Sequence, residues 1–273
     1  MDGRSAGHGV VVSTRHVQSK VPHVTVYFWA VMVMVATVGQ AGAYFLTVRV
    51  HLAPVIATAA IGGLLGWALL LQFTARRYTP WRFWTAAALT NIAATLVTLD
   101  LVSGAGFPVI KTAIGFAVLL AATLVVWRLS EGTCSIESIV TRRREVFYWV
   151  SMALAFVCGT AIGDALAWRI GLGFGHTAGL VAIGIAAIAI GQRGHLLNLA
   201  LAFWGACVLT QPIGASLRDW LSLSPQKGGL GLGALHPSAA ILIGFAALVL
   251  CFARTGLDRP RLTDDEFIRT APR

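Results

Sequence analysis

The sequence predicts an all-α, polytopic transmembrane helical bundle with eight spans, arranged as four parallel two-helix repeats. Three observations support this prediction: the composition, the number of long apolar stretches and a recurring pair of aromatic residues. Of 273 residues, 57% are hydrophobic and only 12% are charged, whereas soluble domains carry roughly 25% charged residues. This balance excludes an ordinary soluble fold.

Long apolar stretches divide the chain into predicted membrane spans. A bilayer-spanning helix needs roughly 20 predominantly apolar residues, and six stretches reach this length clearly while two are shorter. The predicted spans are 25–47, 54–74, 83–102, 108–127, 147–168, 177–191, 197–217 and 238–252. The first span is too long for the apolar region of a signal peptide, and no Ala-x-Ala cleavage motif closes it. We therefore expect it to be retained as the first transmembrane helix.

Positive charge is distributed unevenly over the predicted connections. Arginine and lysine gather in the N-terminal leader, in the second, fourth and sixth connections and in the C-terminal tail, while the other connections hold few. The positive-inside rule then predicts that both termini are cytoplasmic, which requires an even number of spans. The formal charge of +10 is thereby explained by topology. We expect the lipid bilayer as partner, and no nucleic acid.

An aromatic residue followed by tryptophan marks the start of every odd-numbered span. These pairs are Phe28-Trp29, Phe83-Trp84, Tyr148-Trp149 and Phe203-Trp204. The recurring spacing predicts internal repeats of two spans each, all in the same orientation. The predicted units are a cytoplasmic leader (1–23), repeats at 24–79, 80–141, 142–198 and 199–253, and a cytoplasmic disordered tail (254–273). The tryptophans themselves are expected to be interfacial anchors, because aromatic rings settle at the headgroup level.

The four Trp-marked units and the segment from Ser135 to Trp149 (SIESIVTRRREVFYW) carry a resemblance to a known family. They resemble the bacterial membrane-anchored proteins made of four tandem two-helix repeats of unknown function, over about residues 20–252. The resemblance implies a multi-pass protein of the bacterial inner (plasma) membrane. In this family the odd helices typically present an acidic residue after a glycine-rich stretch. This chain keeps that pattern at 159–164 and 214–219, whereas its first unit has Gln40 and Tyr44 instead of carboxylates.

Three carboxylates qualify as candidates, two within the predicted spans and Asp219 two residues past the end of the seventh; a charged group costs roughly 2.5–3.5 kcal/mol at the centre of a span and therefore suggests function. Asp100, Asp164 and Asp219 follow the tryptophan of their unit by 16, 15 and 15 residues. They are thus predicted at similar depth near the outer side, where they could converge. The alternative for Asp100 is an ion pair with Lys111, and for Asp219 an ion pair with Arg218. Asp164 has no comparable neighbour, so the predicted cation or proton site centres on it.

Neutral polar residues of the odd-numbered spans extend this predicted pathway. Thr160 lies one helical turn before Asp164, so the two side chains share a face. Gln40, Thr210 and Gln211 are expected to add amide and hydroxyl groups from other spans. The alternative is interhelical hydrogen bonding that only holds the bundle together.

Small residues predict close contacts between helices. Gly62 and Gly66, and likewise Gly159 and Gly163, form G-x-x-x-G steps, which let helix backbones approach closely in a membrane. Pro212 lies inside the seventh span and is expected to free a backbone carbonyl there.

Motifs for catalysis or cofactor binding are not found in the sequence. His51, His176 and His236 are candidate metal ligands together with the carboxylates, and ordinary interfacial histidines are the alternative. The cysteines show no C-x-x-C spacing, so neither a zinc site nor a disulfide framework is indicated. Without a nucleophile-and-base pair or a phosphate-binding loop, we expect neither an enzyme nor a cofactor.

Two classes of function remain. The favoured one is a transporter of a small ion or solute, coupled to a cation or to protons; the alternative is a non-transporting membrane scaffold or accessory subunit. A polar cavity between the odd-numbered spans would favour the transporter, and a dry, close-packed centre would favour the scaffold. Homo-oligomer formation is left open.

Overall fold

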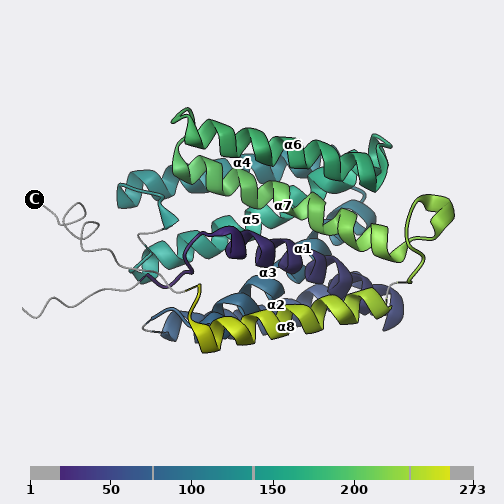
Figure 1. Cartoon of the computed structure of the whole chain (residues 1–273), viewed down its shortest axis with the longest axis horizontal. Coiled ribbons are helices and arrows are strands. Elements are labelled where there is room, and N and C mark those ends of the chain that lie inside the picture. Colours follow the sequence, from purple (N-terminus) through teal and green to yellow (C-terminus); the bar gives the residue numbers. More distant parts are fainter. Residues whose placement is uncertain (1–18, 76, 137–138, 234, 259–273) are drawn as a thin grey trace, which may run out of the picture.

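The computed structural model describes residues 19–75, 77–136, 139–233 and 235–258. Over these residues it contains eight helices that are long and apolar enough to cross a membrane, and no strand. The prediction of an all-α fold with eight spans is thereby confirmed. The helices lie side by side along the longest axis of the molecule (Figure 1).

The helix bounds follow the apolar stretches closely. The helices are α1 (Val26–Tyr44), α2 (Pro54–Thr74), α3 (Pro80–Leu99), α4 (Val109–Glu131), α5 (Arg142–Asp164), α6 (Gly173–Arg193), α7 (Leu199–Ser222) and α8 (Leu235–Thr255). Pro54 and Pro80 stand in the first turn, where a missing N–H leaves no intrahelical bond unmade. The sixth and eighth spans are not short as predicted, since both helices have 21 residues. Their glycine- and histidine-containing ends are helical although they are not apolar.

Three odd-numbered helices continue into a π-helical turn. These turns are η1 (Phe45–Arg49), η2 (Asp100–Gly104) and η4 (Ala165–Arg169). Each begins 16 residues after the tryptophan of its helix, whereas α7 remains α-helical to Ser222. A π turn changes the direction of the side chains that follow it, and such turns are frequent at functional sites.

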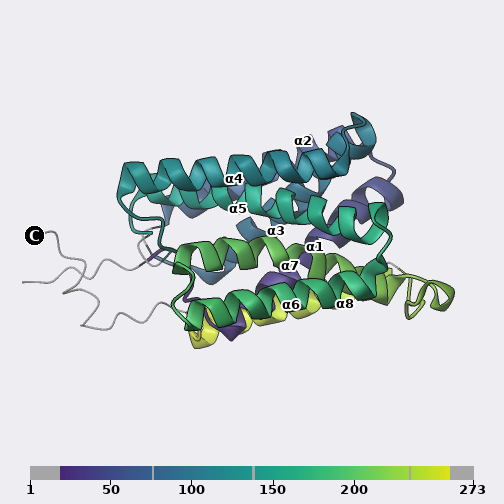
Figure 2. The same ribbon diagram turned by 90° about the horizontal axis from the view of Figure 1, so that it is seen from above.

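The odd-numbered helices form the centre of the bundle. α1 packs against α3 and α7, and α5 packs against the same two helices, so the four close a ring. Each even-numbered helix lies outside and packs against the odd-numbered helix that follows it: α2 on α3, α4 on α5, α6 on α7, and α8 back on α1. Figure 2 shows α2 and α4 along one edge of the bundle and α6 and α8 along the opposite edge.

The aromatic-Trp pairs meet at the N-terminal end of this ring. In each pair of neighbouring inner helices the first aromatic residue of one packs on the tryptophan of the next, with ring centroids 5.4 to 5.7 Å apart. The four contacts are Phe28–Trp84, Phe83–Trp149, Tyr148–Trp204 and Phe203–Trp29. Trp84 is fully buried, and Trp149 and Trp204 are exposed by only 4% and 2%. For these three tryptophans the expectation that they are interfacial anchors is therefore wrong, because they fill the centre of the bundle, whereas Trp29 is only partly buried.

Glycines bring the inner helices into backbone contact. A Cβ atom added at Gly159 would lie 2.2 Å from the carbonyl oxygen of Val208, and one added at Gly163 would also press on α7. Close packing predicted for these two glycines is confirmed. Gly62 and Gly66 have nothing within 4 Å of an added Cβ, so the same prediction is wrong for α2, which packs on α3 through its other face.

A buried ion pair fastens the N-terminal segment to the end of the bundle where the aromatic cluster lies. The Lys20 amine lies 2.8 Å from a carboxylate oxygen of Glu145, which is fully buried. The Gln72 amide donates a hydrogen bond to the other carboxylate oxygen over 3.1 Å. The segment before α1 is thus packed against α2 and α5.

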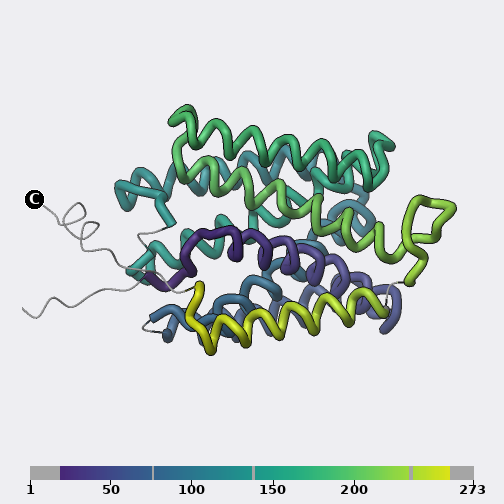
Figure 3. Tube along the Cα trace, in the orientation of Figure 1, coloured from purple at the N-terminus to yellow at the C-terminus, as the bar shows by residue number. Residues whose placement is uncertain are grey.

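The chain after α8 returns to the same end, as the trace in Figure 3 shows. The His23 amide donates to the Asp258 carbonyl over 3.1 Å, and the Asp258 carboxylate accepts hydrogen bonds from Tyr78 and Trp84. Burial, and then the neighbouring carboxylate, raise the pKa of Tyr78 well above its usual value. Asp258 is 2% exposed, so the predicted disorder is wrong for 254–258, while 1–18 and 259–273 lie outside the described residues.

Candidate functional site

A small, largely enclosed cavity lies at the opposite end of the inner ring from the aromatic cluster. It has a volume of about 30 Å³ and is bounded by α1, α5, η4, α6 and α7. Its polar lining consists of Gln40, Asp164, Thr177, Ser216, Arg218 and Asp219. Because about 10–15 Å³ already accommodates a water molecule, the cavity of about 30 Å³ has room for a few water molecules or a small bare cation.

Three of the residues predicted from the sequence line this one cavity: Gln40 of α1, Asp164 of α5 and Asp219 of α7. Asp164 and Asp219 both stand 15 residues after the tryptophan of their helix. Since the tryptophans meet in one layer, equal spacing along neighbouring helices brings these carboxylates to the same depth.

The two carboxylates have different surroundings. Asp219, which is 6% exposed, accepts a 2.5 Å hydrogen bond from the guanidinium of Arg218. That guanidinium also lies over the ring of Tyr44, 5.0 Å from its centroid. Asp164 makes neither a hydrogen bond nor an ion pair with any residue in the described ranges. The Arg218 guanidinium therefore neutralises Asp219. The Asp164 carboxylate remains available to bind a ligand, a proton or water.

Further polar groups of the cavity also lack a hydrogen-bond partner among the described residues. The Thr177 side chain is 1% exposed, and its hydroxyl makes no hydrogen bond within the part of the chain that the structure describes. The same holds for the amide nitrogen of Gln40. A buried polar group left unsatisfied costs about 1–3 kcal/mol, which a bound water or ion would relieve. The Asp164 carboxylate and the Thr177 hydroxyl offer oxygen atoms of the kind that bind small hard cations, whereas the Gln40 nitrogen is a hydrogen-bond donor for a water molecule or an anionic oxygen.

Other predicted pathway residues lie apart from the cavity. Thr160 is 2% exposed with an unpartnered hydroxyl one turn before Asp164, but it does not line the cavity. The Thr210 hydroxyl donates to the carbonyl of Cys207 over 2.7 Å. Gln211 accepts a 2.7 Å hydrogen bond from Asn91. The Gln211 contact matches the alternative of interhelical hydrogen bonding, whereas the Thr210 bond stays within α7.

The hydrogen bond between Asn91 and Gln211 also closes the centre of the bundle. Asn91 belongs to α3 and Gln211 to α7, two helices that α1 and α5 separate in the inner ring. Both residues stand seven positions after the tryptophan of their helix. The amide pair therefore lies between the aromatic cluster and the depth of the carboxylates.

Asp100 faces outwards, away from the cavity. Its carboxylate accepts a 2.6 Å hydrogen bond from the hydroxyl of Thr58 in α2. The alternative of an ion pair with Lys111 is also wrong, since no such pair occurs between these two described residues. Asp100 stands 16 rather than 15 residues after its tryptophan, and one residue rotates a side chain by about 100° around a helix. It therefore points towards the outer helix.

The three candidate metal-binding histidines are all exposed. His51 precedes α2, while His176 and His236 lie near the starts of α6 and α8. Within the described ranges no three side chains of the metal-ligating types gather into one group. The four cysteines are free.

Sequence reasoning did not identify Thr177 as a cavity residue, nor the contact that Tyr44 makes with the cavity residue Arg218. A signal for the first was present, because each even-numbered helix carries a Thr-Ala or Ser-Ala pair near its start. In α2 and α6 this pair places a hydroxyl at the depth of the carboxylates of the inner helices: Thr58 bonds Asp100, and Thr177 lines the cavity with Asp164 and Asp219. The contact between Tyr44 and Arg218 joins α1 to α7 and could not be derived from sequence spacing.

Comparison with known proteins gives one finding of similarity. No curated protein and no solved structure matches the chain significantly. Residues 202–257 match the family described as Repeat of Unknown Function (DUF347), and this segment contains Arg218 and Asp219 of the cavity. The chain is thus an all-helical protein whose eight apolar helices fit a multi-pass membrane protein, with a segment similar to an uncharacterised repeat family.

Proposed function

We propose that this protein transports a small cation or protons and that the cavity around Asp164 is its binding site. The observation that carries the proposal is an unpaired carboxylate beside a buried, unpartnered hydroxyl of Thr177. In a membrane an uncompensated carboxylate is expensive, so a cation, a proton or confined water is expected to occupy this place.

The neighbouring ion pair provides a way to couple binding to movement. A cation that enters the cavity would attract both carboxylates and weaken the bond between Arg218 and Asp219. Released from Asp219, the guanidinium would remain on the ring of Tyr44, so α1 and α7 would respond to occupancy. Passage to the other side would further require the Asn91–Gln211 hydrogen bond and the aromatic cluster to open.

The transporter is proposed to consist of four two-helix repeats around one axis. This is supported by the aromatic contact that recurs between all four neighbouring pairs of inner helices. It is also supported by three π turns at equivalent positions and by outer helices that each pack on the following inner helix. The segment similar to the repeat family, 202–257, corresponds to the last of these units.

We also propose the bacterial inner membrane as its location, with both termini in the cytoplasm. The positive charges near the chain ends and in the second, fourth and sixth connections support this orientation. Reporter fusions at Arg143 and after Arg273 should give cytoplasmic signals. A periplasmic signal from either fusion would contradict the orientation.

Flux measurements on reconstituted vesicles test the proposed function. Vesicles that contain the protein and a dye for pH, sodium or potassium should respond faster to an imposed gradient than empty vesicles. Asp164→Asn keeps the side-chain volume but removes the charge, and we expect a loss of at least about ten-fold in the rate, equivalent to ~1.4 kcal/mol. Asp100→Asn is the matched control, because this carboxylate lies at similar depth but outside the cavity.

The result also decides between the proposal and its alternative. If a folded Asp164→Asn variant transports as fast as the parent, the cavity is not the binding site. If the parent moves none of these ions faster than empty vesicles, the transporter proposal is wrong. A scaffold or accessory subunit would then be the better explanation, and the close packing from the amide pair to the aromatic cluster already favours it.

A further inference from the structure

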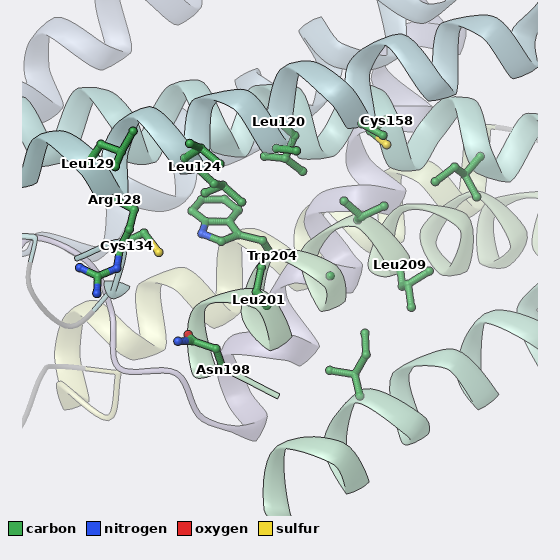
Figure 4. Close-up of a pocket in the computed structure, with 17 residues that line it drawn as sticks. Leu120, Leu124, Arg128, Leu129, Cys134, Cys158, Asn198, Leu201, Trp204 and Leu209 are labelled. Carbon is green, nitrogen blue, oxygen red and sulfur yellow. The ribbon is translucent and has the colours of Figure 1, made fainter. Parts of the chain in front are cut away.

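A long apolar groove runs along the outside of the inner ring, between α4 and α6 (Figure 4). It has a volume of about 700 Å³. α4 contributes Ala117, Ala121 and Leu124, and α7 contributes Leu201, Trp204 and Leu209. α4 packs on α5 and α6 packs on α7, so the two outer helices leave the groove open towards the surroundings of the bundle.

The length of the groove corresponds to one leaflet of a bilayer. Its lining on α4 extends from Ala117 to Leu129, a rise of about 18 Å at ~1.5 Å per residue. Half of the hydrocarbon core of a membrane is roughly 15 Å. Since α4 ends at Glu131, the groove begins near one membrane surface and ends near the midplane.

Polar groups occur at the surface end of the groove. Figure 4 shows the guanidinium of Arg128 and the amide of Asn198 at that end, near Cys134. Arg128 is exposed and forms no ion pair with the residues described. Asn198 is also exposed, and its side-chain oxygen caps α7 by accepting from the Ala200 amide over 2.9 Å. The Asn198 side-chain nitrogen remains as a second donor beside Arg128.

We propose that this groove binds an anionic phospholipid. The lipid comes from the membrane leaflet at the end of the bundle where the aromatic cluster and residues 19 and 258 lie. One acyl chain lies along α4 and α7, and the phosphate contacts Arg128 and the amide of Asn198. An apolar groove open to lipid cannot hold water favourably, and a basic residue at the membrane surface attracts anionic headgroups. The combination distinguishes this place from the rest of the lipid-facing surface. The proposal concerns binding alone and does not depend on transport through the cavity.

Lipid binding to the purified protein tests the headgroup contact. The detergent-solubilised protein is titrated with phosphatidylglycerol or phosphatidylcholine, and bound lipid is counted by native mass spectrometry. We expect phosphatidylglycerol to bind more tightly, and Arg128→Gln to weaken its binding about five-fold, which corresponds to ~1 kcal/mol for one basic residue. Arg193→Gln is the control, because Arg193 is exposed at the corresponding end of α6 but does not line the groove.

A second pair of variants tests the acyl-chain contact. Ala121→Phe should fill the groove and remove one tightly bound lipid. Ala122→Phe adds the same ring at the next position of α4, outside the groove, and should leave the number unchanged. Circular dichroism and gel filtration establish that each variant is folded; if Ala121→Phe is not, the smaller Ala121→Leu takes its place.

Three results would overturn the proposal. Equal affinity for both lipids, with no effect of Arg128→Gln, would show that the cation does not select a headgroup. Unchanged lipid counts in folded Ala121→Phe would show that no acyl chain lies in the groove. A change in oligomeric state in that variant would instead identify the groove as a contact between copies of the chain.

Discussion

The buried ion pair between Lys20 and Glu145 makes a sharp prediction for stability. Glu145 is fully buried and the Lys20 side chain is 11% exposed, and their charged atoms lie 2.8 Å apart. Glu145→Gln preserves the shape of the side chain but leaves a nearly buried ammonium group without its counter-charge. Breaking one partner of a buried pair costs about 3–5 kcal/mol.

This cost should appear as a lower melting temperature of the purified protein. At ~2–4 °C per kcal/mol for chains of about 150–250 residues, the expected decrease is roughly 6–20 °C. The measurement is thermal unfolding in detergent, followed by circular dichroism at a fixed heating rate, because membrane proteins often unfold irreversibly. The matched control is Glu131→Gln. Its partners Arg143 and Arg144 are 66% and 22% exposed, so it should cost about 1 kcal/mol or less.

A double substitution separates charge from packing. Lys20→Met combined with Glu145→Gln removes the uncompensated cation and should recover a large part of the lost stability. If Glu145→Gln lowers the melting temperature no more than Glu131→Gln does, the ion pair is not a significant tie and the reasoning is refuted. If the double variant is no better than the single one, the loss arises from the hydrogen bond of Gln72 instead.

Two further predictions concern packing and pH. Gly159→Ala should lower the free energy of unfolding by about 1–3 kcal/mol, because the added methyl group overpacks against Val208. Gly62→Ala is the control: its methyl group meets open space and should change the stability by no more than about 0.5 kcal/mol. Equal melting temperatures for the two variants would contradict this prediction. Tyr78→Phe should cost about 1–3 kcal/mol below pH 10, because Asp258 loses its hydroxyl donor. The raised pKa of Tyr78 keeps the hydroxyl protonated in the folded protein while the unfolded chain ionises. The parent protein should therefore lose stability as the pH rises above about 10, and the difference in stability between it and Tyr78→Phe should shrink there. A stability difference between the two proteins that stays constant with pH would count against this explanation.

Much of the fold could be predicted from the sequence because a membrane imposes length and apolarity on every span. The predicted spans and the observed helices agree in number and order, and the aromatic-Trp pairs identified the helices that form the centre. The role of those pairs was predicted wrongly, because spacing alone does not show whether a ring faces lipid or another helix. The π turns were missed, because the apolar pattern does not distinguish an i→i+5 hydrogen-bonded turn from the α-helix that it continues.

The candidate site, like the fold, was predicted correctly only in part. Equal spacing after the tryptophans correctly suggested that Asp164 and Asp219 lie at one depth. Asp100 differs by a single residue, and the resulting rotation around the helix axis directs it to Thr58 instead. The Arg218–Tyr44 contact joins the last inner helix to the first, and such a tertiary contact is not encoded in local periodicity.

The order in which helices pack has a consequence for biosynthesis. Because α1 packs on α7 and α8, its contacts on that side do not exist until the final part of the chain has been made, about 150 residues after α1 itself. At a synthesis rate of about 5–20 residues per second this delay is roughly 8–30 s. During that time the polar and glycine-lined side of α1 faces lipid or the insertion machinery. Closure of the ring is therefore a late step, and a chain arrested before α7 would leave α1, α3 and α5 as an open arc.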